Sequence, residues 1–157
     1  MKKLISLTIN GTEYEIAVKS NTTLVDLLRY ELGLTGTKKG CELGDCGSCT
    51  VIMDGKPVNS CLVLAVQANG RTILTIEGLE TDDGLDPLQK SFVEKGAIQC
   101  GFCTSGMILS AKSLLEKDPN PSDSTIRSAI SGNLCRCTGY QKIIEAIKPE
   151  QKEKQYE

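Results

Sequence analysis

Histidine is absent from this 157-residue sequence, and its absence removes much of the usual catalytic and metal-binding chemistry. Without an imidazole the chain can form neither a Rieske-type cluster nor a zinc site that mixes cysteine with histidine. A Ser-His or Cys-His nucleophile pair is excluded as well, together with a histidine general base. Little of the ordinary machinery for bond-making catalysis is left.

Long apolar runs and an excess of one charge are also lacking. The 18 basic and 20 acidic residues are mixed along the chain, which indicates no nucleic-acid binding. No apolar segment approaches the roughly 20 residues that a membrane-spanning helix needs. The segment that follows Lys2 and Lys3 is too short and too polar for an export signal. We therefore expect a cytoplasmic protein that binds neither nucleic acid nor a membrane.

Cysteine, by contrast, is abundant, with eight residues in the chain. In a reducing compartment such thiols are more often metal ligands or reactive groups than disulfides. They fall into two groups of four along the sequence. The first quartet comprises Cys41, Cys46, Cys49 and Cys61, and the second comprises Cys100, Cys103, Cys135 and Cys137.

The first quartet has the plant-type spacing of a [2Fe-2S] cluster, C-x4-C-x2-C with a distant fourth cysteine. A structural zinc site is the main alternative. Four-cysteine zinc sites usually show two short knuckles of similar spacing, whereas three of these cysteines share one glycine-rich loop. The spacing therefore favours iron-sulfur over zinc and over unrelated thiols.

The second quartet has a different pattern, C-x2-C followed after a long gap by C-x-C. This spacing alone fits either a [2Fe-2S] cluster or zinc, and a dithiol redox site is a further alternative. Cys103 and Cys137 are each followed by threonine, a small residue and an apolar helical pattern. Two such half-sites would aim two helix N-termini at one anionic centre, although common capping residues could produce the same repeat by coincidence.

The first half of the chain reads as a small mixed sheet packed on a helix. Alternating segments around Asn10-Gly11 predict a hairpin. Thr23 and Asp26 then resemble a capping box for a leucine-rich helix that ends at Gly33. The remainder of this half predicts a glycine-rich loop, a second hairpin, a short helix and a closing strand, at residues 36–49, 50–59, 62–68 and 72–76.

The second half reads as helical. An acidic segment with two glycines, residues 77–86, suits a linker, so we place a domain boundary near residue 80 and expect domains 1–79 and 80–157. Apolar residues at helical spacing predict four short helices, at 88–95, 107–115, 126–130 and 143–147. The predicted fold class is α+β.

The cysteine motifs resemble those of a known family. CELGDCGSC (41–49) with Cys61, then QCGFCTSGM (99–107) and GNLCRCTGY (132–140), are similar to the small iron-sulfur subunit of the molybdenum hydroxylases, the xanthine dehydrogenase and aldehyde oxidoreductase family. The resemblance extends over nearly the whole chain, to about residue 147. One departure is Ser105, where the family usually has proline, and we expect this serine to cap the helix start instead.

The resemblance implies an N-terminal plant-ferredoxin-like β-grasp domain and a C-terminal all-α four-helix domain. Each domain would hold one [2Fe-2S] cluster through its cysteine quartet. A large partner subunit would carry molybdopterin with molybdenum, and a medium partner subunit would often carry FAD. The second quartet would then lie beside the pterin, which Gln99 and Cys137 would contact, and the first would lie towards the flavin. Without the resemblance, Gln99 is interpreted as a polar residue that hydrogen-bonds the loop backbone.

Together these observations lead to the hypothesis of an oxidoreductase subunit that carries electrons and has no catalytic residue of its own. Single electrons would pass from the molybdopterin site through two [2Fe-2S] clusters to FAD or another acceptor, within a hetero-oligomer whose dimerisation is left open. The alternatives are a free-standing ferredoxin-like electron carrier and a zinc-stapled interaction module.

Overall fold

The computed structural model describes residues 1–148, so the end of the expected second domain lies outside the described residues. The strands are β1 (Lys2–Ile9), β2 (Thr12–Lys19), β3 (Thr50–Met53), β4 (Lys56–Asn59) and β5 (Thr72–Leu74). They form one sheet in the order β2-β1-β5-β3-β4, in which only the β1–β5 pair is parallel. The closing strand is shorter than predicted, because the chain turns into a 3-10 helix, η3 (Ile76–Leu79).

Both predicted hairpins are present, and their turns explain their register. Asn10 and Gly11 have φ values of 51° and 79°, and Asp54 and Gly55 have 48° and 76°. Two consecutive positive φ angles are the mark of a type I′ turn, whose twist matches that of the flanking strands. The Asn-Gly and Asp-Gly signals in the sequence were therefore sufficient to place these turns.

The helix after the first hairpin begins where the sequence predicts it and then changes its hydrogen-bond period. It consists of α1 (Leu24–Asp26) and a π-helical turn, η1 (Leu27–Glu31). The Thr23 hydroxyl accepts the Asp26 N–H at 3.3 Å, and the Leu32 N–H reaches the Leu27 carbonyl at 3.1 Å. Leu24, Leu27 and Leu28 are fully buried against the sheet. A second short turn, η2 (Ala65–Ala68), covers less than the helix predicted at 62–68.

All four helices predicted in the second half are present. They are α2 (Pro87–Glu94), α3 (Thr104–Lys117), α4 (Asp123–Ala129) and α5 (Gln141–Ile147). The longest, α3, has 14 residues, and no helix within residues 1–148 is long and apolar enough to cross a membrane.

The prediction that Ser105 caps α3 was wrong. The N-cap residue is Cys103, and Ser105 is already within the first helical turn. The Ser105 hydroxyl is buried and has no hydrogen-bond partner among the described residues, yet the helix still starts at Thr104.

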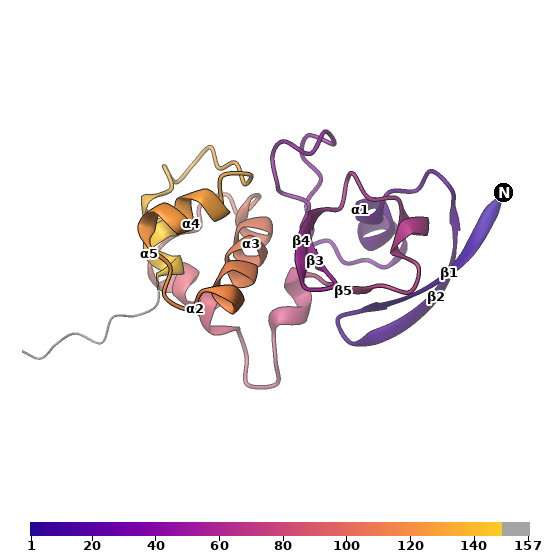
Figure 1. Cartoon of the computed structure of the whole chain (residues 1–157), viewed down its shortest axis with the longest axis horizontal. Helices are drawn as coiled ribbons and strands as arrows, with labels where there is room; N and C mark the ends of the chain where they lie inside the picture. Colours follow the sequence, from indigo (N-terminus) through magenta and orange to yellow (C-terminus); the bar gives the residue numbers. More distant parts are fainter. Residues whose placement is uncertain (149–157) are drawn as a thin grey trace, which may run out of the picture.

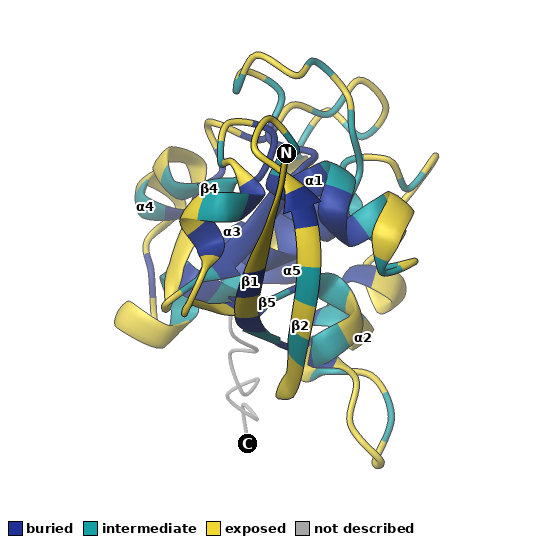
Figure 2. Ribbon diagram, turned by 90° about the vertical axis from the view of Figure 1, so that its right-hand side faces the viewer, coloured by how far each residue is buried: buried dark blue, intermediate teal, exposed yellow. Residues whose placement is uncertain are grey.

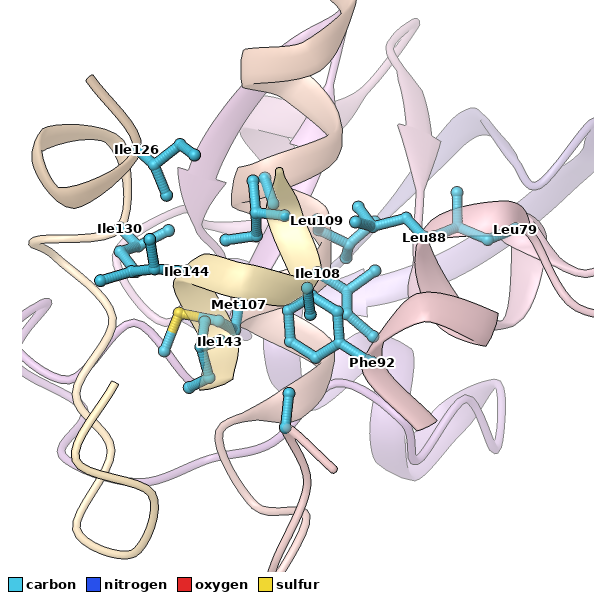
Figure 3. Packing of buried hydrophobic residues seen from close by; sticks show 14 of the residues in the cluster. Leu79, Leu88, Phe92, Met107, Ile108, Leu109, Ile126, Ile130, Ile143 and Ile144 are labelled. Atoms are coloured by element: carbon cyan, nitrogen blue, oxygen red, sulfur yellow. The ribbon is translucent and has the colours of Figure 1, made fainter. Parts of the chain in front are cut away.

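Strand β3 is buried on both faces, and this joins the two halves of the chain. Val51 belongs to the core between the sheet and α1, whereas its neighbour Ile52 belongs to the core of the helical half. Helix α3 packs on β3 and β4, as Figure 1 shows. In the helical core the Phe92 ring lies beside Ile108 (Figure 3). At the far edge of the sheet, β2 is largely exposed (Figure 2).

A polar network ties the first cysteine loop to the junction between the halves. The Asn10 side chain accepts the Thr75 N–H at 2.9 Å, and the Thr75 hydroxyl donates to Glu77 at 2.6 Å. The other oxygen of the Glu77 carboxylate accepts the Gly36 N–H at 2.7 Å, where the loop begins. The start of this loop is therefore held by the first hairpin turn and by η3.

The closest approach between the two halves requires glycine at two positions. Gly47, in the first cysteine loop, has a φ of 70°, and a Cβ there would run into the Gly132 carbonyl oxygen. A Cβ on Gly106, in α3, would run into the Gly47 carbonyl oxygen. Because both obstacles are backbone atoms, no side-chain rotation can relieve them.

We predict that Gly106→Ala destabilises the protein despite alanine's better helix propensity. The propensity gain is about 1 kcal/mol, and overpacking against backbone costs about 1–3 kcal/mol or more. Thermal unfolding of the cluster-loaded protein should show an apparent Tm several degrees below that of the wild type. Gly132→Ala is the matched control, since its Cβ would meet nothing within 4 Å. A Gly106→Ala variant that melts at or above the wild-type temperature would contradict this packing argument.

Candidate metal centres

The first quartet is assembled by one loop and one strand end. Cys41, Cys46 and Cys49 lie on the loop that leads into β3, and Cys61 follows β4. The thiols are neighbours in pairs, Cys41 beside Cys46 and Cys49 beside Cys61. The β3–β4 hairpin therefore brings the distant fourth cysteine to the other three.

Backbone N–H groups favour the thiolate form at the outer end of this quartet. The Leu43 and Cys46 N–H groups point at the Cys41 sulfur, at 3.3 and 3.4 Å, and lower the pKa of that thiol to about 6. A thiolate is the form that binds metal, so these donors prepare Cys41 as a ligand.

Two cysteines of the first quartet, Cys49 and Cys61, are shielded from water. Burial, followed by contact with Cys49, raises the pKa of the Cys61 thiol to about 11. Cys49 and Cys61 are both buried, with exposures of 2% and 8%. A bound metal takes the place of the thiol proton, so metal binding and folding are coupled at this end of the site.

The second quartet joins two loops that are far apart in the sequence. Cys100 and Cys103 precede α3, and Cys135 and Cys137 precede α5. The thiols are again neighbours in pairs, Cys103 beside Cys135 and Cys100 beside Cys137. Each pair therefore has one cysteine from each loop. Burial, followed by contact with Cys135, raises the pKa of the Cys103 thiol to about 12, whereas Cys100 and Cys137 are exposed.

Two pairs of thiols in each quartet fit a [2Fe-2S] cluster, whose two irons each take two cysteine ligands. Among residues 1–148, no three Cys, Asp or Glu side chains gather closely enough to hold a single ion. The first loop also leaves little room beside its sulfurs, because a Cβ on Gly40 would lie 2.9 Å from Cys46 Sγ. The donor set and the shape of the loop thus suit an anionic cluster wrapped by backbone.

The two quartets are joined by a direct backbone contact. The Leu134 N–H donates to the Cys46 carbonyl at 2.9 Å, and Leu134 immediately precedes Cys135. Asn133, which is buried, donates its side-chain amide to the Gly47 carbonyl at 3.1 Å and to the Thr50 hydroxyl at 3.3 Å. The loops that carry the cysteines accordingly lie at the same edge of the molecule, at the top of Figure 1.

Gln99 lies beside the second quartet, and its side chain bonds backbone in this structure. Its amide nitrogen donates to the Cys137 carbonyl at 3.1 Å, which ties together the two loops of that quartet. This is the backbone role that the residue types alone suggest. Gln99 is nevertheless exposed, as is Cys137, so both are accessible from outside the chain.

Sequence reasoning missed two residues that shape the second quartet. Asn133 fixes its loop to the first quartet, as described above. The Tyr140 hydroxyl accepts the Cys135 N–H at 2.8 Å and donates to the Asn133 carbonyl at 3.4 Å. Both belong to the GNLCRCTGY motif, but a short motif in one sequence does not say which of its side chains bond across the fold. The two helix starts also differ in their distance from the cysteines. Helix α3 begins at Thr104, directly after Cys103, whereas α5 begins at Gln141, three residues after Thr138.

Comparisons with known proteins agree with this geometry. A family described as "2Fe-2S iron-sulfur cluster binding domain" matches residues 7–75, and one described as "[2Fe-2S] binding domain" matches residues 75–148. The nicotinate dehydrogenase small FeS subunit of Eubacterium barkeri is 52% identical over 147 residues, covering 94% of each chain. The caffeine dehydrogenase subunit gamma of Pseudomonas sp. strain CBB1 is 55% identical over 148 residues, covering 92% of this chain and 89% of that one.

Among solved structures, a chain of quinoline 2-oxidoreductase from Pseudomonas putida 86 superposes with a TM-score of 0.92 at 53% identity. The match covers 94% of this chain and 91% of that one. The fold and the two cysteine quartets define an iron-sulfur protein with two [2Fe-2S] clusters. More particularly, the chain belongs to the family of small iron-sulfur subunits of the molybdenum hydroxylases.

We predict that the two quartets act as independent cluster sites. Cys49→Ser should abolish one of two EPR signals of the reduced protein, and Cys103→Ser should abolish the other, because each change removes a ligand from one quartet only. EPR of the dithionite-reduced variants, with circular dichroism to check folding, measures this. Loss of both signals from either single change, with the fold intact, would show that the sites are not independent.

Proposed function

We propose that this chain is the electron-transfer subunit of a molybdenum-containing hydroxylase or dehydrogenase. In this proposal single electrons leave a molybdopterin site on a large partner subunit, pass through two [2Fe-2S] clusters here, and reach FAD on a medium subunit or another acceptor. The observation that carries the proposal is the pairing of two four-cysteine sites through the Leu134–Cys46 backbone hydrogen bond. A chain built only to bind metal needs no such contact between its sites.

The proposed ligands follow the two quartets. They are Cys41, Cys46, Cys49 and Cys61 for one cluster and Cys100, Cys103, Cys135 and Cys137 for the other. We further propose that residues 1–79 form a β-grasp domain of the plant-ferredoxin type and that residues 80–157 form a helical cluster-binding domain. The sheet order and the set of four helices support this division.

The proposed direction of electron flow runs from the second quartet to the first. Gln99 and Cys137 would contact the pterin of the large subunit, and their exposure beside Cys100 supports an approach from that side. Inside the chain, a backbone connection between the two sets of proposed ligands runs from Cys135 through Leu134 to Cys46. The chain's own contribution is to hold the ligands in place, supply N–H donors to sulfur and exclude water from the buried pair Cys49 and Cys61.

Exposed apolar side chains beside both quartets support a subunit role over a freely diffusing carrier. Leu43, Phe102 and Leu134 are 72%, 47% and 56% exposed, and each sits on a loop that carries cluster ligands. Apolar groups left in water around a functional site are typical of a surface that a partner protein covers. A free-standing ferredoxin would need only the first quartet and would leave the helical half unexplained.

Substrate choice would reside on the large subunit. The nicotinate and caffeine enzymes and the quinoline oxidoreductase are named for three different compounds, yet their matched chains are 52%, 55% and 53% identical to this one. Nearly equal similarity to all three means that this chain does not distinguish among such substrates. The flavin subunit, dimerisation of the complex and a cytoplasmic location are parts of the same proposal.

We predict that the purified chain contains about four iron and four acid-labile sulfide atoms, as two [2Fe-2S] clusters require. It should show no substrate-dependent dye reduction alone, and it should co-purify with a molybdenum-containing subunit that restores this activity. Metal and sulfide analysis, with a dye-reduction assay of the chain and of the complex, measures these outcomes. Zinc in place of iron, a stable monomer without partners, or turnover by the chain alone at the rate of the complex would each refute the proposal.

A further inference from the structure

One cysteine of each quartet receives a side-chain hydroxyl at its sulfur. The Ser48 hydroxyl lies 3.2 Å from Cys46 Sγ, and the Thr138 hydroxyl lies 3.1 Å from Cys135 Sγ. Neither Ser48 nor Thr138 is a proposed ligand.

The direction of these hydrogen bonds follows from the chemistry of the ligands. A cysteine that binds iron does so as a thiolate and has no proton to give, so the hydroxyl must donate. Ser48 is only 3% exposed, which keeps water from competing for its proton. The Thr138 oxygen already accepts the Tyr140 N–H at 3.2 Å, and its own O–H is directed at sulfur.

The two cysteines concerned are the ones that join the quartets. Cys46 supplies the carbonyl that accepts the Leu134 N–H, and Cys135 is the next residue after Leu134. The hydroxyl donors therefore act on the sulfurs of the two cysteines that this backbone connection joins. Cys61, also in the first quartet, is buried in a cluster with Val25 and Cys49.

We propose that Ser48 and Thr138 are positioning residues that raise the reduction potentials of their respective clusters. The inference rests on the proposed electron-transfer function. Reduction adds one electron and no proton to a cluster, so the negative charge on its cysteine sulfurs grows. A hydrogen bond to a more negative acceptor is stronger, and each hydroxyl thus stabilises the reduced state of the cluster it touches.

The test is to remove each hydroxyl and to measure both potentials by EPR-monitored redox titration of the cluster-loaded protein. Ser48→Ala should lower the potential of the cluster whose signal Cys49→Ser abolishes, and Thr138→Val should lower the potential of the other. We expect the reduction equilibrium to shift by about a factor of ten in each case, which for one electron is about 59 mV. The cluster that is not touched should keep its potential.

Two control variants separate hydrogen bonding to sulfur from a general effect on packing. Ser60 is fully buried beside Cys61, but its hydroxyl donates to the Cys49 carbonyl at 2.6 Å and not to a sulfur. Ser60→Ala should leave both potentials unchanged. Thr138→Ser keeps the hydroxyl and should keep the wild-type potential.

Unchanged potentials in Ser48→Ala and Thr138→Val, or an equal shift in Ser60→Ala, would overturn the inference. Should Ser48→Ala fail to hold its cluster, Ser48→Gly removes the same hydroxyl with a different change in packing, and the same drop is expected. These outcomes are distinct from a failure of the proposed function. The potentials are measured on clusters that are present in the protein. The proposed electron-transfer function, by contrast, fails if iron, the partner subunit or partner-dependent turnover is missing.

Discussion

The hydrogen bond between the Leu134 N–H and the Cys46 carbonyl is the contact on which the rest of the site depends. It forms only because backbone meets backbone at this point, which requires glycine at positions 47 and 106. The Asn133 side chain supports the same contact, because its amide donates to the Gly47 carbonyl and the Thr50 hydroxyl in the first half of the chain. Two cysteine loops that start some ninety residues apart are thereby fixed side by side, and the chain becomes one unit with two connected metal sites.

Within each quartet, the cysteines differ in their exposure and in the hydrogen bonds that their sulfurs receive. In the first quartet the outer sulfur of Cys41 receives backbone N–H donors, whereas Cys61 is buried and dry. In the second quartet Cys103 is half-buried, whereas Cys100 and Cys137 are exposed. Each quartet therefore combines cysteines of different exposure. Hydrogen bonding, charge and exposure are the levers that set cluster potentials, and all three vary within this chain.

Much of the fold was predictable because its signals are local. Asn10-Gly11 and Asp54-Gly55 placed both hairpins, Thr23 marked the start of α1, and apolar spacing located all four later helices. The errors also have local causes. Ser105 replaces the proline usual in the family, which predicts a capping serine, whereas Cys103 occupies the cap position. The leucines of the π-helical turn after α1 are buried against the sheet, and the sequence pattern did not predict the change of hydrogen-bond period.

Taken alone, the sequence determined the candidate ligand types and their grouping, since cysteine spacing and the absence of histidine are properties of the chain itself. Only the tertiary structure decided which thiols are neighbours, that Cys46 and Cys135 lie at the contact between the quartets, and that the Ser48 and Thr138 hydroxyls lie within hydrogen-bond distance of their sulfurs. The physical reason is that a hydrogen bond depends on distance and direction between groups far apart in the chain. This distance and direction are set by the packing of α3 on β3 and by the glycines that allow it. The spacing of residues along the sequence specifies neither the distance nor the direction.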